Sequence, residues 1–256
     1  MHNTLITDSI LTKDPAELAS KVRLYEHLMK SCYGAYVPSY FVGYEVLGDQ
    51  EAMTLKYTWE LTVYFAFYVF PFINDLFTDT RFIPLYFSKF AHLGLVNSNL
   101  QVFIKDYYQW KKLSGQTART PIFNDFTELG PLRTAESTFY RVGVSIEEAR
   151  TILDTQVRNL LELARFMVAH IHSVVLADER ALTNRPFVES INPYDFHFDP
   201  DEMRKRYCEF SDSTEEYLWS FDPFVLQRFR IAGEEIRLNE ELVNDMQSSL
   251  EEVAVG

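Results

Sequence analysis

Apolar and polar positions follow a helical period along much of the chain. Asp14 stands directly ahead of Pro15, and the following stretch, AELASKVRLYEHLMK, repeats apolar side chains at helical spacing. An acceptor side chain before a proline is typical of a helix start, so we expect a helix over about 15–31. Pro38 then interrupts the pattern. The segment EAMTLKYTWELTVYFAFYVF contains no helix breaker before Pro71 and predicts a central helix, buried on most faces.

The middle of the chain predicts further helices. Residues 82–113 carry two amphipathic stretches around Gly94 and predict one or two helices. Ser145 and Glu148 form the Ser-x-x-Glu pattern of a capping box, and the apolar stripe behind them predicts a helix to about Asp178. Between these segments, residues 114–138 contain SGQTARTP and a Gly-Pro pair, which predict a long loop.

The last part of the chain alternates loop and helix signals. Three prolines within residues 184–200 predict a loop, and Asp199 with Pro200 repeats the helix start signal. Ser213 with Glu216 gives a second capping pattern. From Pro223 onward we expect a terminal helix.

These patterns together predict an all-α protein. No segment shows convincing strand-period alternation, so we expect one helical bundle of roughly eight to ten helices. The bundle would span residues 1–256 as one domain, with the loop at 114–138 as the best place for an internal boundary. The hydrophobic content of 47% supports a sizeable core, and the aromatic content of 15% supplies bulky side chains to fill it.

Charge and cysteine usage narrow the classes of function. The formal net charge is −13 and no Lys/Arg-rich run interrupts it, which argues against nucleic-acid binding. Cys32 and Cys208 lie far apart without a Cys-x-x-Cys spacing, so neither a disulfide framework nor a zinc ribbon is indicated. A reducing compartment fits these two cysteines best.

The location that we expect is cytoplasmic. The N-terminal stretch MHNTLITDSILTKDP lacks the basic and apolar regions of a secretory signal. The longest uncharged stretch, Leu61 to Asn74, has fourteen residues, whereas a membrane-spanning helix needs about 20. We therefore interpret this stretch as part of a protein core.

Common catalytic motifs are absent. The chain contains no His-Glu-x-x-His, Gly-x-Ser-x-Gly, Walker or Gly-x-Gly-x-x-Gly motif, and no glutamate precedes a histidine by three positions as in di-iron bundles. His170 and His172 point to different sides of a helix and cannot chelate one ion together. Each of them, like His92, is either a core histidine or a single ligand, for example to haem.

Two acidic residues suggest a metal site instead. Asp75 and Asp79 stand four positions apart and would share a helix face, an arrangement that suits Mg²⁺. Near the C-terminus, Asn244, Ser248 and Glu252 stand at i, i+4 and i+8, so an amide, a hydroxyl and a carboxylate would align along one helix stripe. Three oxygen ligands in a row can hold one divalent ion.

This second pattern resembles the metal triad of class I terpene synthases, all-α enzymes that ionise prenyl diphosphates with Mg²⁺. Their aspartate-rich motif ends an aromatic helix at about the depth where YFAFYVFPFINDLFTD lies here, with Asn74 in place of the first aspartate. The resemblance implies a Mg²⁺ cluster and a cavity whose aromatic residues stabilise carbocations. The residues implied are Asp75, Asp79, Asn244, Ser248 and Glu252 for the metal, Trp59, Tyr64, Phe67 and Tyr68 for the cavity, and arginines such as Arg228 and Arg230 for the diphosphate.

Two other classes of function stay open. An acidic terminal helix produces the Asn244, Ser248 and Glu252 stripe by composition alone, and the apolar positions of that helix lie roughly opposite the stripe. The chain would then be a non-catalytic all-α protein that encloses a hydrophobic ligand or a cofactor such as haem. Alternatively, it is a helical protein-interaction module with a solid aromatic core.

Overall fold

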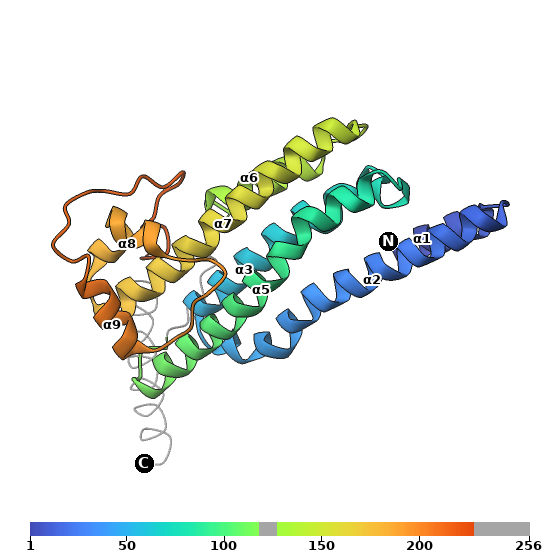
Figure 1. Cartoon of the computed structure of the whole chain (residues 1–256). Helices are drawn as coiled ribbons and strands as arrows, with labels where there is room; N and C mark the ends of the chain where they lie inside the picture. Colours follow the sequence, from blue (N-terminus) through green and yellow to red (C-terminus); the bar gives the residue numbers. More distant parts are fainter. Residues whose placement is uncertain (118–126, 228–256) are drawn as a thin grey trace, which may run out of the picture.

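Three long helices set the framework of the molecule, which we describe from a computed structural model for residues 1–117 and 127–227. They are α2 (Pro15–Gly43), α5 (Phe82–Leu113) and α7 (Ile146–Leu176), and all three run in the same direction (Figure 1). Helix α3 (Gln50–Tyr64) runs the opposite way among them. No strand occurs in the described ranges, so the prediction of an all-α fold is confirmed.

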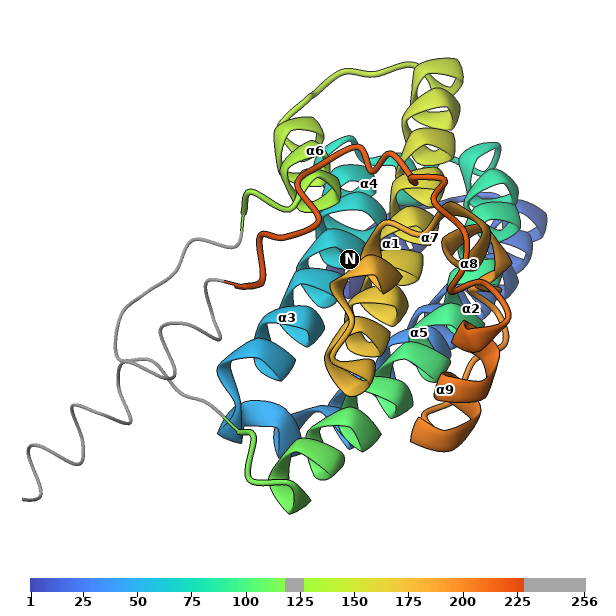
Figure 2. The same cartoon turned by 90° about the vertical axis from the view of Figure 1, so that its left-hand side faces the viewer.

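Shorter elements cover the ends and sides of this framework. Helix α1 folds back along the first half of α2, and α6 packs beside α3 and α7. Helices α8 and α9 lie against α7 on the opposite flank from α6 (Figure 2). Their bounds are α1 His2–Leu11, α4 Phe70–Ile73, α6 Gly130–Phe139, α8 Arg185–Ser190 and α9 Pro200–Cys208, with 3₁₀ turns η1 Tyr44–Gly48, η3 Leu76–Thr78 and η4 Glu179–Leu182.

Side-chain caps explain where several helices begin. Ser145 accepts from the Glu148 backbone N–H, and the Glu148 carboxylate accepts from the Ser145 N–H, so both halves of the predicted capping box form. The Asp14 carboxylate accepts from two backbone N–H groups at the start of α2, and Asp199 does the same at the start of α9. Both predicted helix starts at Asp-Pro pairs are therefore confirmed.

Prolines end fewer helices than the sequence suggests. Helix α2 continues through Pro38 to Gly43, well beyond the predicted end near residue 31, and packs along α5. The central helical segment also passes Pro71: a π-helical turn over Phe65–Val69 follows α3 and leads into α4. A proline costs an isolated helix about 3 kcal/mol, which packing in a folded protein can offset. The expected breaks at these two prolines are therefore wrong.

Residues 82–113 form one unbroken helix through Gly94, which is one of the two arrangements expected there. Other boundaries differ from expectation. The segments predicted as loops contain the helices α6 and α8. Their prolines stand in the first turn of each helix, where proline is favourable, and do not interrupt it. Ser213 and Glu216 cap no helix; Glu216 instead forms an isolated antiparallel bridge with Asn184. The pattern does not predict α1, whose start has no side-chain cap.

Aromatic side chains fill the core between the long helices. Trp59, Phe67, Tyr86 and Phe103 are among the largest side chains that are fully buried. Helix α7 is long and apolar enough to cross a membrane by composition, but 67% of its most apolar stretch is buried inside the protein. Its apolar residues thus serve the core of the bundle.

Candidate functional site

The segment predicted to hold a metal is a turn rather than a helix. Helix α4 ends at Ile73, and Asp75 adopts the left-handed conformation with φ of 53°. Asp79 follows the short 3₁₀ turn η3 in an extended conformation. The two carboxylates therefore do not share one helix face, which removes the geometric reason for pairing them on a single ion.

Asn74 and Asp79 both have structural partners in this turn. The Asn74 amide donates to the Phe70 and Arg141 carbonyls at 3.0 and 2.8 Å, and its oxygen accepts from the Val144 N–H at 3.3 Å. It joins the end of α4 to the loop before α7. The Asp79 carboxylate accepts from Arg81 Nε and Nη2 at 3.1 and 2.7 Å, and these bonds lower its pKa.

The other half of the predicted metal site lies outside the described residues. Asn244, Ser248 and Glu252, together with Arg228 and Arg230, fall within residues 228–256. Mg²⁺ binding by Asp75 and Asp79 opposite this triad stays a prediction. Within residues 1–117 and 127–227, no group of three or more His, Cys, Asp or Glu side chains is arranged to hold a metal ion.

The aromatic residues predicted to line a cavity belong to the packed core or to the surface. Trp59 is fully buried, and its indole N–H donates to Asn97 Oδ1 at 2.8 Å. Phe67 is also fully buried and its ring lies 5.5 Å from that of Phe90. Tyr68 donates its hydroxyl to the Cys32 carbonyl, whereas Tyr64 is 44% exposed. The cavities described below are lined by other residues.

The two neighbouring histidines of α7 have different environments. His170 Nε2 lies 2.6 Å from the Glu51 carboxylate, and both side chains are buried. His172 points elsewhere, with its Nδ1 bound to the Val168 carbonyl, so the prediction that the pair cannot chelate one ion agrees with their partners. The side chain of His92 lies outside the described residues.

His170 belongs to a buried charged cluster that joins three helices. Lys111 at the end of α5 binds Asp49 at 2.8 Å and Glu51 at 2.7 Å. The Tyr107 hydroxyl donates to the same Glu51 carboxylate at 2.9 Å. All five side chains are at most 3% exposed, and Asp49 also caps α3 through the Ala52 N–H. The cluster has the composition of a structural ion-pair network that orders the ends of α3, α5 and α7.

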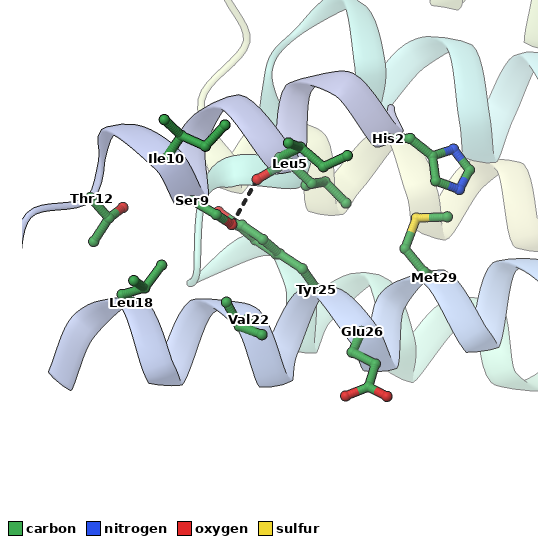
Figure 3. Close-up of a pocket in the computed structure, with 11 residues that line it drawn as sticks. His2, Leu5, Ser9, Ile10, Thr12, Leu18, Val22, Tyr25, Glu26 and Met29 are labelled. Atoms are coloured by element: carbon green, nitrogen blue, oxygen red, sulfur yellow. Dashed lines mark hydrogen bonds between the residues drawn. The ribbon is translucent and has the colours of Figure 1, made fainter. Parts of the chain in front are cut away.

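An apolar groove between α1 and α2 is the candidate functional site. The two helices run antiparallel, and side chains from both face the space between them (Figure 3). The groove has a volume of about 540 Å³. His2 and Met29 lie at one end, and Thr12 and Leu18 at the other. The remaining lining residues are Leu5, Ile6, Ser9, Ile10, Val22, Tyr25 and Glu26.

The groove has no charge directed into it. Glu26 points away in Figure 3, and its carboxylate binds Lys30 at 2.6 Å. The charged residue of α1, Asp8, accepts from the Tyr25 hydroxyl at 2.6 Å and binds Lys21 at 3.0 Å. Burial alone would raise the pKa of Asp8, but these two partners lower it. These polar bonds tie α1 to α2 while leaving the groove apolar.

Aliphatic side chains around the groove remain in solvent. Ile10 is 76% exposed and Ile6 is 56% exposed. Val22 on the facing wall is 47% exposed. Single exposed aliphatic residues are common on proteins, whereas a contiguous group around a concave surface is typical of interaction sites. Sequence reasoning missed this site because the sequence pattern did not predict α1, and the groove exists only where α1 packs on α2.

Comparison of the chain with protein-family models, with curated protein sequences and with solved structures finds no match. The groove and the buried cluster are therefore interpreted from their geometry and chemistry alone.

Proposed function

We propose that the protein is a helical interaction module whose α1–α2 groove binds an amphipathic helix of a partner protein. The observation that carries the proposal is the group of exposed aliphatic residues Ile6, Ile10 and Val22 along an apolar groove of about 540 Å³. A helix that lays its apolar face into a groove is a recurrent mode of peptide recognition. A bound helix would remove both walls of the groove from water.

The exposure of the walls favours a helix over a small hydrophobic ligand. Sites for small molecules enclose about 70–90% of the ligand surface. Ile10 is 76% exposed and Ile6 is 56% exposed, so a small ligand between them would stay largely in water. A partner helix is wide enough to cover α1 and α2 at the same time. Residues Leu18 to Met29 of α2 offer roughly 16 Å of wall at a rise of 1.5 Å per residue.

Charge indicates what kind of partner helix fits. The groove itself directs no charged group at its occupant, so the docking face of the partner is aliphatic. The whole chain carries a formal charge of −13, which repels a second copy and attracts a basic partner. Helix α1, HNTLITDSIL, contains no Lys or Arg, unlike helices that lie on anionic membranes. We therefore commit to a partner helix with an aliphatic face and Lys or Arg on its flanks.

A model peptide tests this function. The probe is a fluorescein-labelled helical peptide with Leu at i, i+3, i+4 and i+7 and with Lys and Gln at the other positions. Binding to the full chain is measured by fluorescence polarisation. We expect saturable binding that Ile10→Glu weakens by about tenfold or more, because the new carboxylate would be buried against leucines.

The matched control is Leu113→Glu. Leu113 is 89% exposed and is the last residue of α5, whose C-terminal end lies away from α1 in Figure 1. The same change in charge there should therefore leave peptide binding within about twofold of the wild type. Absence of saturable binding, or equal weakening by both substitutions, would overturn the proposal. Light scattering that shows a dimer disrupted by Ile10→Glu would assign the groove to a second copy and would also overturn it.

A further inference from the structure

A second, smaller cavity lies on the other flank of the molecule, where α9 packs against α7. Its volume is about 160 Å³. Val168, Ile191 and Met203 form apolar walls, and His172 and Arg206 supply polar groups. Asp195, His197 and Glu202 lie at the exposed rim, where His197 Nε2 is 2.6 Å from the Glu202 carboxylate.

The tautomer of His172 follows from its hydrogen bond. Nδ1 lies 2.7 Å from the Val168 carbonyl, which can only accept, so Nδ1 carries the proton. Burial, with a smaller contribution from the charge of Arg206, outweighs the Val168 bond and lowers the pKa of His172 to about 4. The ring is therefore neutral near pH 7, and its Nε2 is a hydrogen-bond acceptor.

His172 is one of the residues that line the cavity. The bond from Nδ1 is the one hydrogen bond of this ring to the described part of the chain. Phe103 and Phe187 lie beside the ring and offer no hydrogen bond to Nε2. Nε2 itself is accessible to solvent, so a donor from water or from a ligand can reach it in the cavity.

Arg206 provides the complementary group. Its Nη2 donates to the Ser190 carbonyl and lies 3.4 Å from the Ser190 hydroxyl, which fixes the guanidinium at the cavity wall. A guanidinium has five N–H donors, so further donors remain to bind an anion. The rim carboxylates of Asp195 and Glu202 are solvent-exposed and act on the cavity through water, which weakens their effect.

We propose that this cavity binds a small hydroxycarboxylate, whose hydroxyl donates to His172 Nε2 and whose carboxylate binds Arg206. The cavity volume corresponds to about five water molecules at roughly 30 Å³ each, so the ligand has about five to eight non-hydrogen atoms. This site is separate from the α1–α2 groove and does not depend on the function proposed for it.

Lactate, propionate and 1,2-propanediol form a matched set of probes. Propionate lacks the hydroxyl of lactate, and 1,2-propanediol lacks its carboxylate. Binding to the full chain and its variants is measured by isothermal titration calorimetry, and in proteins that keep His172 the ¹⁵N shift of its Nε2 reports a hydrogen bond accepted by that atom. We expect a saturable shift with lactate at about millimolar Kd, and binding of each analogue at least about fivefold weaker.

Two substitutions assign the polar groups, and one serves as a control. His172→Phe should abolish the preference for lactate over propionate, because Phe has no acceptor. Arg206→Met should weaken lactate binding by about tenfold or more while leaving 1,2-propanediol unaffected. His197→Ala changes the exposed rim and should alter lactate binding by less than about twofold. Circular dichroism of each variant verifies the fold, and Arg206→Lys restores the charge if Arg206→Met is unfolded.

If the ¹⁵N resonance shows no saturable shift even at lactate concentrations well above millimolar, the proposal is overturned and water is the occupant. Equal binding of lactate and propionate would also overturn it. Because Ile10→Glu lies in the groove, its effect on peptide binding is measured separately, so failure of one site leaves the other intact.

Discussion

The Lys111 ammonium lies 2.7 Å from the Glu51 carboxylate, and both side chains are almost completely buried. The contact joins the end of α5 to the start of α3, and Asp49 binds the same ammonium. Burial of such groups is favourable only while their charges and hydrogen bonds match. The integrity of this end of the bundle therefore depends on one lysine.

Replacing Lys111 with Met should destabilise the protein strongly. The substitution keeps much of the volume but removes the cation that binds Asp49 and Glu51 inside the core. We expect a loss of about 3–5 kcal/mol in the free energy of unfolding, measured by urea denaturation. The neighbouring Lys112→Met is the control, since Lys112 is exposed and should change stability by less than about 0.5 kcal/mol. Equal midpoints for the two variants would contradict a stabilising role for the cluster.

His172 should make stability depend on mildly acidic pH. Its pKa is about 4 in the folded protein and 6.5 in the reference state, so the unfolded chain binds a proton first as the pH falls. The contribution is fully present above pH 6.5 and is lost between pH 6.5 and about 4, with a total of roughly 3 kcal/mol. The measurement is the free energy of unfolding across this range for the wild type and His172→Phe.

The comparison with His172→Phe isolates this effect from other titrating groups. As the pH falls from 6.5 to about 4, the free energy of unfolding should decrease more for the wild type than for His172→Phe. A difference that stays constant from pH 7 to pH 4 would show that His172 titrates normally in the folded state.

Asn74 should matter for stability rather than for metal binding. Its amide makes three hydrogen bonds, two of them to the loop ahead of α7. Asn74→Ala should lower the free energy of unfolding by about 1–3 kcal/mol, because backbone groups of Arg141 and Val144 lose their partner. Thermal unfolding with and without Mg²⁺ provides the measurement. A Mg²⁺-dependent rise in midpoint that Asn74→Ala abolishes would instead support the metal site.

The prenyl diphosphate hypothesis has a direct assay. The protein is incubated with geranyl or farnesyl diphosphate and Mg²⁺, and released diphosphate is measured. We expect no release above buffer, because Asp79 binds Arg81 with both carboxylate oxygens and Asp75, at the other end of turn η3, does not share a helix face with it. Release that Asp79→Asn abolishes and that Asp14→Asn retains would establish the enzymatic hypothesis and overturn our expectation. Asp14 is the control because it caps α2 at a distant exposed position.

The helical class could be predicted because local signals carry it. The Ser145–Glu148 box and the Asp-Pro starts of α2 and α9 act within a few residues, so they are visible in the sequence. Proline was misleading for the opposite reason: whether a helix survives Pro38 or Pro71 depends on packing by distant segments. Ser213 and Glu216 matched a capping pattern, but their segment pairs with Asn184 instead.

The candidate sites could not be predicted because they depend on long-range contacts. Glu51 and His170 are 119 residues apart in the chain and meet only in the folded bundle. The groove exists because α1 turns back on α2, and its lining comes from two faces that look ordinary in isolation. A neutral imidazole against a guanidinium, as in the His172 cavity, likewise requires the packing of α9 on α7.

The arrangement of α1 has a consequence for amide hydrogen exchange. Leu5 is its one buried residue, whereas the charged cluster secures the opposite end of the bundle. Local opening should therefore begin at α1, whose backbone amides would exchange first. A helix that docks in the groove would slow their exchange, so the least protected helix of the free protein would report directly on the partner that it recognises.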